Sequence, residues 1–352
     1  MNGILFTLGI LILVIVCDLW GFTTIQITSL IVTGVSLLHF LTSVPGNLAW
    51  KATLYLVGTV QFIVSSEKKG MSKGIPNPEK LLKCEDIKKK RIIFIRHGES
   101  VWNEMFNKGF LPPGFPFRVV RGVVRELFLL TSRDSVFYDS PLSSEGETQA
   151  KDLASFLSSE SNSKDKFIRI LNGEEGSSVV VSSCLRRALS TVFIGLYGRF
   201  EKYGSKVLSM SVLQEMSRNV DTVAVSPARK LARLPVCERR YGADGYVPFF
   251  DSASHEGNKS PFRRAYKDML AFNEWVFKRN EDTIIVGGHS LWFKQYYRCF
   301  LPRDSDHESK KYKMVNAGAI GFELSYGQTK DGAVYRIDPS SMTTIYGGYK
   351  RK

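Results

Sequence analysis

Charge is nearly absent from the first 64 residues. The chain has 352 residues, with 48 Lys and Arg against 34 Asp and Glu, yet only Asp18 and Lys51 fall in this stretch. The stretch is too long to be an ordinary apolar core element. A cleaved signal peptide fits poorly, because no basic residue precedes the apolar run and apolar sequence continues far beyond any cleavage site. A mitochondrial transit peptide would instead be amphipathic and rich in Arg.

This scarcity of charge predicts a membrane anchor over residues 1–64. Two spans are expected, Ile4 to Trp20 and Thr24 to Leu41, with a turn near Asp18. Asn47 to Val64 is then a third span or an interfacial helix. The alternative is a hydrophobic helical hairpin packed within a soluble protein.

Basic residues crowd the sequence just after the apolar region. They are Lys68, Lys69, Lys73, Lys80, Lys83 and residues 88–91. Because basic residues that flank a span stay on the cytoplasmic side, the domain that follows is predicted to face the cytosol from an endomembrane or mitochondrial membrane. Residues 65–90 are polar, contain Gly and Pro, and lack periodicity, so they are expected to form a basic linker that can also contact membrane lipids.

Cysteine is also scarce. The five cysteines are Cys17, Cys84, Cys184, Cys237 and Cys299, and they show no metal-ligand spacing. A disulfide framework and a zinc site are therefore disfavoured, and the thiols fit a reducing, cytosol-like compartment. No metal or other cofactor is expected.

Acidic residues are too few to balance the basic ones, and the formal net charge is +14. All of this excess lies beyond residue 64. A basic domain suggests anionic partners, such as phosphorylated substrates, an anionic membrane face or nucleic acid. The sequence has no nucleic-acid-binding motif, so nucleic acid is not expected as a partner.

What the sequence does contain is a set of short apolar runs that end in polar residues suited to chemistry. Ile92 to Ile95 reads as a buried strand that runs into Arg96-His97-Gly98. In open α/β sheets, ligands bind at the carboxyl ends of the strands. Arg96 offers a planar fork of donors suited to phosphate, and His97 can be a neutral nucleophile near pH 7.

Two further predicted strands end in comparable residues. Val179 to Val181 leads to Arg186 and Arg187 near a helix start, where anions are favoured. Thr283 to Val286 leads to His289, so two of the five histidines follow buried strands. The alternation of strands with helices predicts a three-layer α/β domain, with a mostly parallel central sheet flanked by helices.

These motifs resemble the histidine phosphatase superfamily, in its phosphoglycerate-mutase-like branch. The signature stands here as Arg96-His97-Gly98-Glu99, followed by Trp102-Asn103. The similarity continues through Ser183-Cys184-Leu185-Arg186-Arg187-Ala188 and Leu213-Gln214-Glu215, and it covers roughly Arg91 to Asp338. Alignment on the Leu and Ala of the middle segment selects the second of its two arginines.

The resemblance implies a role for each matched residue. His97 would attack phosphorus and form a phosphohistidine, while Glu215 would protonate the leaving group and later deprotonate water. The expected catalytic residues are thus His97, Glu215 and His289. The expected phosphate-binding residues are Arg96, Asn103, Arg187 and His289.

An insertion at about residues 105–138 departs from the compact pattern of the family. Within it, Phe117 to Leu130 is predicted to form an amphipathic helix, with Arg118, Arg121 and Arg125 on one face. Such a helix is a substrate lid, a membrane-surface helix or an ordinary insertion helix. Residues 339–352 are expected to form a C-terminal tail.

The predicted function is a membrane-anchored phosphatase that hydrolyses phosphomonoesters, with a protein, a lipid-linked compound or a small molecule as the phosphorylated substrate. One alternative is an inactive family member that acts as a structural or interaction subunit, in a homo-oligomer or a membrane complex. A second alternative is a phosphoglycerate mutase. Mutases of this family carry Arg-His-Tyr-Gly directly after the Glu, whereas Met216 to Asn219 follow Glu215 here.

Overall fold

The computed structural model describes residues 24–109, 111 and 114–350. Its contacts divide the chain into two compact units. The first comprises Met1–Tyr55 with Phe128–Arg133, and the second comprises Leu56–Leu127 with Asp134–Lys352. All of the predicted site residues belong to the second unit.

An eight-stranded sheet forms the centre of the second unit. Its strand order is β4-β3-β2-β5-β1-β7-β8, with β9 paired to β7. Strands β1 to β5 pair in parallel, whereas β7, β8 and β9 add antiparallel pairings on one side. The bounds are β1 Ile87–Arg96, β2 Ser178–Ser183, β3 Val207–Met210, β4 Phe250–Asp251, β5 Thr283–Gly288, β7 Ala319–Thr329, β8 Gly332–Ile337 and β9 Thr343–Tyr346. A separate pair joins β6 (Lys313–Met314) to β10 (Tyr349–Lys350).

Strand β1 carries the first predicted site residues. Its basic first half is exposed and its second half is buried. Ile92 and Phe94 pack into the core on one face of the sheet, and Ile93 and Ile95 pack into the core on the other. A strand that is covered on both faces is apolar at successive positions rather than at alternate ones, which explains the unbroken apolar run.

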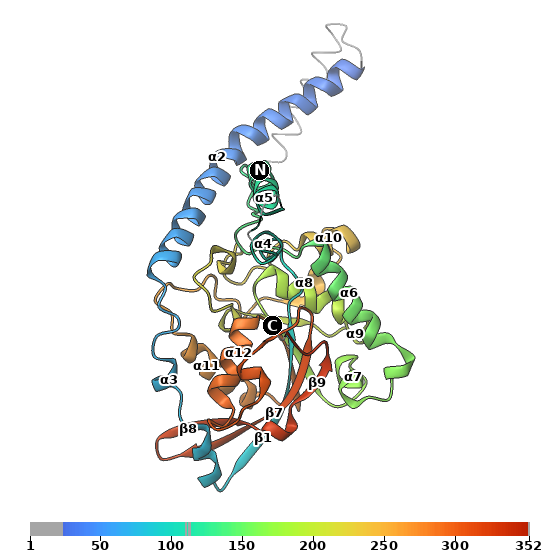
Figure 1. Cartoon of the computed structure of the whole chain (residues 1–352). Helices are drawn as coiled ribbons and strands as arrows, with labels where there is room; N and C mark the ends of the chain where they lie inside the picture. Colours follow the sequence, from blue (N-terminus) through green and yellow to red (C-terminus); the bar gives the residue numbers. More distant parts are fainter. Residues whose placement is uncertain (1–23, 110, 112–113, 351–352) are drawn as a thin grey trace. The chain divides into compact units, whose positions relative to one another are not determined.

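Helices cover both faces of the sheet, as Figure 1 shows. Helices α11 and α12 pack on the face of Phe94, and α6, α8 and α9 pack on the face of Ile95. The bounds are α4 Val101–Phe106, α6 Ser144–Ser158, α7 Lys166–Leu171, α8 Arg186–Gly195, α9 Tyr197–Tyr203, α10 Pro235–Tyr241, α11 Ala265–Lys278 and α12 Ser290–Phe300. The predicted α/β fold, with a mostly parallel central sheet flanked by helices, is confirmed.

The segment expected to be a basic linker, residues 65–90, is folded onto the domain. Met71 and Ile75 join the core on the α11 and α12 face, and the backbone N–H of Ala265 donates to the carbonyl of Glu67 (3.1 Å). The segment contains α3 (Met71–Gly74), the helical turn η1 (Pro78–Lys83) and the start of β1. Its few buried apolar residues stand singly among polar ones, a pattern too sparse to indicate packing.

Two other boundaries differ from those predicted. The strand expected over Val207 to Leu213 ends at Met210 and continues as the helical turn η3 (Ser211–Leu213). The expected tail, residues 339–352, contributes β9 and β10, which pair with β7 and β6. Such short strands are stabilised by partners distant in sequence, so local composition indicates them weakly.

Residues Thr24–Val64 form one helix of 41 residues, α2, and Pro45 lies inside it. The sequence predicted two separate elements here, Thr24 to Leu41 and Asn47 to Val64. The helix continues through Pro45, which has no backbone N–H to donate within it. In the part of the chain that the structure describes, no helix is both long enough and apolar enough to cross a membrane. The first predicted span, Ile4 to Trp20, lies outside that part.

The last turns of α2 are counted with the second unit and pack on it. A Cβ atom on Gly58 would lie 2.3 Å from Cε1 of the Tyr138 ring, so a residue without a side chain is needed for this close approach. Gln61 is buried, and its side-chain amide donates to the Ser65 hydroxyl (3.3 Å). This part of the apolar helix is therefore partly covered by the domain.

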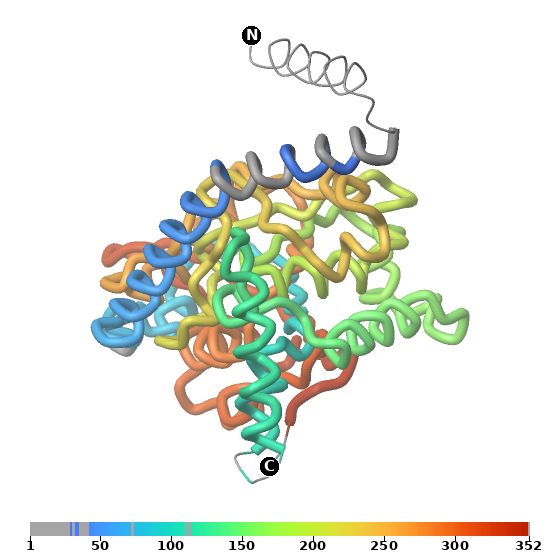
Figure 2. Tube along the Cα trace, turned by 90° about the horizontal axis from the view of Figure 1, so that it is seen from above, coloured from blue at the N-terminus to red at the C-terminus, as the bar shows by residue number. Residues whose placement is uncertain are grey.

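Helix α5 (Gly114–Phe128) is the helix predicted for the insertion, and it can be followed as the teal-green helix in Figure 2. Its buried Glu126 accepts hydrogen bonds from the Ser135 hydroxyl (2.9 Å) and the Val136 backbone N–H (2.8 Å). Several of its apolar side chains are exposed, namely Phe117, Val120, Val123, Val124 and Leu127. The insertion thus presents an apolar surface beside its arginines.

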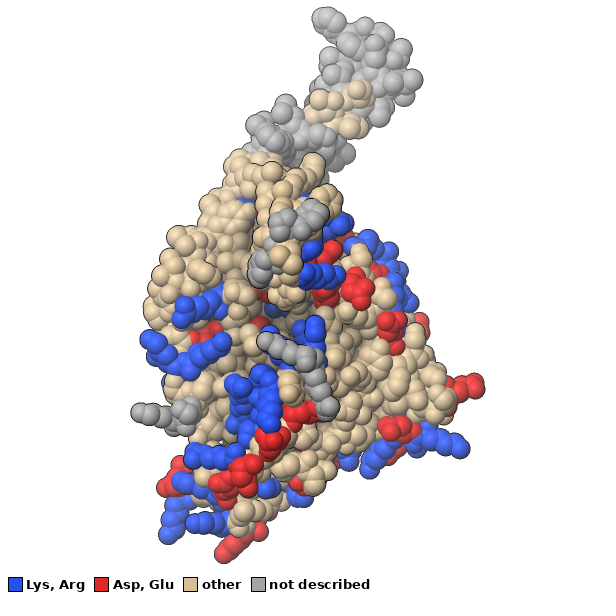
Figure 3. All heavy atoms as spheres, viewed as in Figure 1, with Lys and Arg blue, Asp and Glu red and all other residues tan. Residues whose placement is uncertain are grey.

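The excess of basic residues is visible on the surface. In Figure 3, Lys and Arg side chains gather over the part of the face where Figure 1 places α12. Some of these cations are held by backbone carbonyls, as when Nε of Arg298 donates to the carbonyl of Lys310 (2.8 Å). A surface of this kind favours anionic partners.

Phe94 is the aromatic centre of the core on the α12 face. Its ring stacks on Phe293 with 4.1 Å between centroids and meets Phe322 edge-on at 4.9 Å. We expect Phe94→Ala to lower the free energy of unfolding by about 3–5 kcal/mol, because it leaves a cavity in a packed interior. Urea unfolding of the full chain measures the change. Phe262→Ala is the control, since that ring is 69% exposed; equal effects of the two substitutions would contradict the packing described.

Candidate active site

Three neighbouring parallel strands bring the candidate site to one edge of the sheet. Strand β5 lies between β1 and β2, so the carboxyl ends of the three strands meet. β1 ends at Arg96, β5 is followed by His289, and β2 leads to Arg187 at the start of α8. The backbone N–H of His97 donates to the carbonyl of Gly288 (2.9 Å) and joins the ends of β1 and β5. Residues far apart in sequence are therefore neighbours here.

His97 is buried, and its ring lies next to that of His289, with 5.1 Å between the centroids. Its Nδ1 atom lies 2.5 Å from the carbonyl oxygen of Gly98. Because a carbonyl oxygen only accepts hydrogen bonds, Nδ1 carries the proton and Nε2 keeps its lone pair. A nucleophilic imidazole needs this tautomer when Nε2 is the attacking atom.

Burial and positive charge both keep the imidazole of His97 neutral. Burial lowers the pKa of His97 well below its usual value, and the guanidinium groups of Arg187 and Arg96 lower it further. The ring is therefore neutral at pH 7, and its Nε2 lone pair is available.

His289 occupies the N-terminal cap position of α12, directly after β5. Its Nε2 pairs with the Ser183 hydroxyl (2.8 Å), which already accepts from the backbone N–H of Leu185 (3.3 Å). The hydroxyl hydrogen can thus be donated to Nε2, and Nδ1 then carries the imidazole proton. Burial lowers the pKa of His289 well below its usual value, and Arg187 and His97 add to the effect.

Two buried guanidinium groups accompany the histidines. Arg187 donates from Nη1 to the carbonyl of Asp221 (2.7 Å) and pairs Nη2 with the Asp221 carboxylate (3.3 Å). Arg96 donates from Nη1 to the carbonyl of Met314. Burial lowers the pKa of Arg96 to about 10, so this group is still charged at pH 7.

Three nitrogen atoms of this cluster lack a partner. Nε of Arg96, Nε of Arg187 and Nδ1 of His289 are buried, and none of them bonds to an atom of the described residues. An unpaired buried donor costs about 1–3 kcal/mol. The oxygens of a phosphoryl group can accept hydrogen bonds from N–H donors of this kind. The cluster therefore fits an oxyanion better than a neutral ligand.

The neighbouring Arg186 has a different environment. Its guanidinium pairs with the Asp134 carboxylate (2.5 Å) and donates to the carbonyl of Asp139 (2.8 Å). These bonds tie the end of the insertion to the start of α8. It is the charge of Arg187 that acts on both histidines, and this is the arginine that the sequence alignment selected.

Glu215 follows η3 and lies at the start of α12, beside the second histidine. Its carboxylate accepts hydrogen bonds from the backbone N–H groups of Trp292 (2.9 Å) and Leu291 (3.3 Å). Its negative charge partly offsets the lowering of the Arg96 pKa by burial, so the carboxylate lies within electrostatic reach of the cluster. The structure therefore brings Glu215 to the same edge of the sheet.

Asn103 lies in the first turn of α4, which the Ser100 side chain caps (3.2 Å). Its amide oxygen accepts a hydrogen bond from Asn107 (2.9 Å). Among the described residues, the side-chain hydrogen bonds of Asn103 stay within α4 and its end. Its contribution to phosphate binding stays a prediction.

Sequence reasoning missed several residues that shape the site. Asp221 pairs with Arg187, Ser183 anchors the second histidine, and the Thr191 hydroxyl accepts from the backbone N–H of Gly98 (2.9 Å). Only Ser183 had a signal, because it opens the segment that resembles Ser-x-Leu-x-Arg-Ala. Asp221 lies in an irregular stretch whose composition indicates nothing about ion pairing.

No protein-family model and no curated protein matches the chain. Solved structures match it at low similarity. One is a mycobacterial hydrolase, with 16% identity, a TM-score of 0.36, and coverage of 74% of this chain and 100% of that chain. Another is a mycobacterial glucosyl-3-phosphoglycerate phosphatase, at 14% identity, TM-score 0.35, covering 71% and 97%. A third is a phosphoserine phosphatase mutant from Entamoeba histolytica in complex with phosphoserine, at 15% identity, TM-score 0.34, covering 71% and 97%. TM-scores this low do not establish a shared family.

The lowered pKa of His289 makes stability depend on pH. The unfolded chain binds a proton at this residue near pH 6.5, whereas the folded chain resists it, so stability falls as the pH drops below 6.5. From pH 8 to pH 5.5, the wild type should lose about 1.4 kcal/mol more unfolding free energy than His289→Gln. Urea unfolding at the two pH values measures both losses, and the variant differs only at this group. Equal losses in the two proteins would show that the His289 pKa is not lowered.

Proposed function

We propose that this chain is a phosphatase that hydrolyses phosphomonoesters through a phosphohistidine formed on His97. One observation carries the proposal. A neutral His97 with a free Nε2 lone pair lies in a cluster of buried nitrogen donors that lack partners. A nucleophile beside an anion-binding cluster is the arrangement that attack on a phosphoryl group requires. The motifs that resemble the histidine phosphatase superfamily support the same chemistry.

In the first step, the Nε2 lone pair of His97 attacks phosphorus, and the bond between phosphorus and the ester oxygen breaks. Arg96, Arg187 and His289 donate to the phosphoryl oxygens and stabilise their negative charge. Glu215 gives a proton to the departing oxygen. The products are the free alcohol and a phosphohistidine.

In the second step, a water molecule attacks phosphorus from the side that the alcohol has left, and Glu215 accepts a proton from this water. The phosphorus–nitrogen bond breaks, inorganic phosphate leaves, and the neutral imidazole of His97 is restored. The hydrogen bond from Nδ1 to the Gly98 carbonyl keeps the ring oriented throughout. Asn103 adds a neutral donor to the phosphoryl group in this scheme.

Two alternatives fit the chain less well. An inactive subunit is disfavoured, because every predicted catalytic position holds a competent residue and these residues gather at one sheet edge. A phosphoglycerate mutase is disfavoured, because Met216 to Asn219 follow Glu215 in place of the Arg-His-Tyr-Gly of mutases in the family that this chain resembles. A mutase must also exclude water from its phosphorylated form. In addition, the insertion at residues 105–138 replaces the compact segment that follows Asn103 in the family that this chain resembles.

Loss of the nucleophile should abolish turnover. We expect His97→Ala to reduce phosphate release from p-nitrophenyl phosphate by about 10³-fold or more, because the covalent intermediate cannot form. Wild-type protein quenched with ³²P-labelled substrate should yield an acid-labile, base-stable phosphoenzyme that the variant lacks. His307→Ala, at the N-cap of the helical turn η6 (Glu308–Lys310) and outside the cluster, is the matched control.

Undiminished turnover by His97→Ala would overturn the mechanism. The same preparation tests the mutase alternative through interconversion of 2- and 3-phosphoglycerate. Interconversion that exceeds hydrolysis about tenfold, or by ~1.4 kcal/mol in barrier, would reverse the assignment.

We also propose that residues 1–64 attach the chain to a membrane. The uncharged run that precedes Asp18 supports this, as do exposed apolar side chains on α2. These are Val32, Leu48, Leu56, Val57, Val60, Phe62, Ile63 and Val64. Helix α5 combines exposed apolar residues with three arginines, a composition typical of helices that lie at a lipid surface. The site then faces phosphorylated groups at or near the membrane, with protein or lipid-linked phosphates preferred over small sugars.

Membrane attachment predicts a fractionation result. The full-length chain should stay with membranes during alkaline carbonate washing, and Asn258 in Asn258-Lys259-Ser260 should remain unglycosylated, because the domain faces the cytosol. Asn258→Gln is the gel-shift control. Release of the chain by carbonate would contradict attachment, and a glycan on Asn258 would contradict the orientation.

A further inference from the structure

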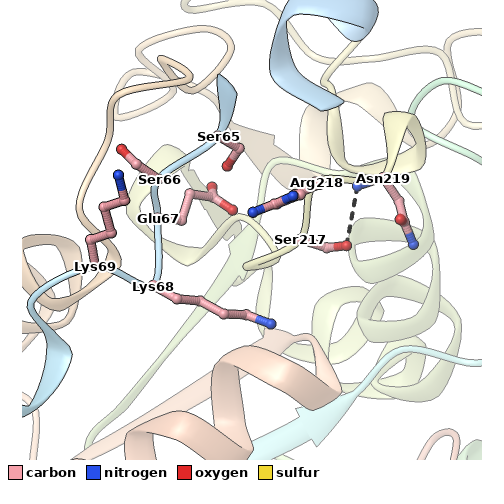
Figure 4. Close-up of a pocket in the computed structure, with 8 residues that line it drawn as sticks. All are labelled: Ser65, Ser66, Glu67, Lys68, Lys69, Ser217, Arg218 and Asn219. Carbon is pink, nitrogen blue, oxygen red and sulfur yellow. Dashed lines mark hydrogen bonds between the residues drawn. The ribbon is translucent and has the colours of Figure 1, made fainter. Parts of the chain in front are cut away.

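A cleft of about 430 Å³ lies outside the cluster described above. It is formed by two short segments that are far apart in sequence (Figure 4). One segment follows α2, and the other begins two residues after Glu215. The lining residues are Ser65, Ser66, Glu67, Lys68, Lys69, Ser217, Arg218 and Asn219. All of them belong to the second unit of the chain.

One buried ammonium group holds the two walls of the cleft together. Nζ of Lys259 pairs with the Glu67 carboxylate in the first wall (2.6 Å). The same Nζ donates to the carbonyls of Glu215 (2.7 Å) and Ser217 (3.0 Å) in the second wall. Lys259 and Glu67 are both buried, so this pair is shielded from solvent. The backbone of the two walls is therefore held in place by buried contacts.

The first wall is also attached to α11. The guanidinium of Arg264 donates to the carbonyl (2.9 Å) and the hydroxyl (2.6 Å) of Ser66. The backbone N–H of Ser66 in turn donates to the carbonyl of Pro261 (3.1 Å). These bonds position the backbone from which Lys68 extends.

The cleft carries unbalanced positive charge. Its only lining carboxylate, Glu67, is already paired with Lys259. Within the described ranges, Lys68, Lys69 and Arg218 form no ion pair. Figure 4 shows Lys68 and Arg218 extending into the space between the two walls, while Lys69 is turned away from it. Two cations that converge on one space favour an anion there.

The cleft is connected electrostatically and along the chain to the catalytic cluster. Burial lowers the pKa of Lys313, and the charges of Arg96 and Lys68 lower it further, while the charge of Glu215 raises it. Lys313 therefore lies within electrostatic range of residues from both the cluster and the cleft. Ser217 lies two residues beyond Glu215, the residue that protonates the departing oxygen in the proposed mechanism.

We propose that this cleft is a second anion-binding subsite, in which Lys68 and Arg218 hold an anionic group on the leaving-group portion of the substrate. The proposal rests on the phosphatase function proposed above and narrows its substrate class to phosphomonoesters that carry a second phosphate or a carboxylate. A neutral alcohol portion would leave both cations unpaired. Residues 65–69, which follow α2, would thus contribute to substrate selection as well as connect α2 to the α/β domain.

The test compares two substrates that differ by one anionic group, phenyl phosphate and 4-carboxyphenyl phosphate. The wild-type full chain should show a kcat/KM about tenfold higher for the carboxylated substrate, equivalent to ~1.4 kcal/mol. The double variant Lys68→Ala/Arg218→Ala should bring this ratio close to one. Both side chains are exposed, so the variant should fold. Lys69→Ala removes the same charge from the same segment and should keep the wild-type ratio.

A binding measurement separates this proposal from the proposed function. Calorimetry compares phenylphosphonate with 4-carboxyphenylphosphonate, which cannot be hydrolysed, on the wild type and the double variant. Hydrolysis without preference for the carboxylated substrate would overturn the subsite and leave the phosphatase standing. A binding preference that the double variant loses, without hydrolysis of either ester, would support the subsite and overturn the phosphatase. Equal binding of the two phosphonates would overturn the subsite whatever the activity.

Discussion

Burial of two guanidinium groups beside two histidines is the constraint on which the rest of the structure depends. Arg96 and Arg187 lie in the interior, where a charge is costly unless it is paired and hydrogen-bonded. Asp221 and backbone carbonyls supply only part of that pairing, since an Nε atom on each arginine has no partner among the described residues. The same positive charges keep both imidazoles neutral. One arrangement therefore keeps the His97 lone pair free and leaves unpaired donors that suit an anion.

The sheet makes this arrangement possible. Because β5 lies between β1 and β2, three strand ends meet where a cation or a histidine follows each strand. Burial of β1 on both faces fixes its register against its neighbours, and a slip of one residue would move Phe94 out of its aromatic cluster. The position of His97 is thus determined by hydrophobic packing several residues earlier in the chain. Stability and chemistry are coupled at this strand.

The region around the site extends beyond the motifs. Glu215 binds the first turn of α12, and Lys259 joins its backbone to Glu67 in the segment after α2. Glu67, which precedes β1 in the sequence, is therefore linked through Lys259 to the loop that carries Glu215, the proposed proton donor. In the proposed mechanism, the Glu67–Lys259 pair thus helps to position the loop that carries the proton donor.

The sequence by itself determined the α/β class, the central strands and the residues with the expected chemistry. Runs such as Ile92 to Ile95 are apolar at every position, as expected of a strand that is buried on both faces. The choice of Arg187 over its neighbour came from the resemblance of this segment to the Ser-x-Leu-x-Arg-Ala motif. The tertiary structure determined the contacts that the local sequence pattern does not indicate. The pairing of Asp221 with Arg187, the role of Ser183 beside His289 and the packing of residues 65–90 all depend on contacts between residues distant in sequence. Such contacts depend on the tertiary fold, and the local composition of the chain does not indicate them.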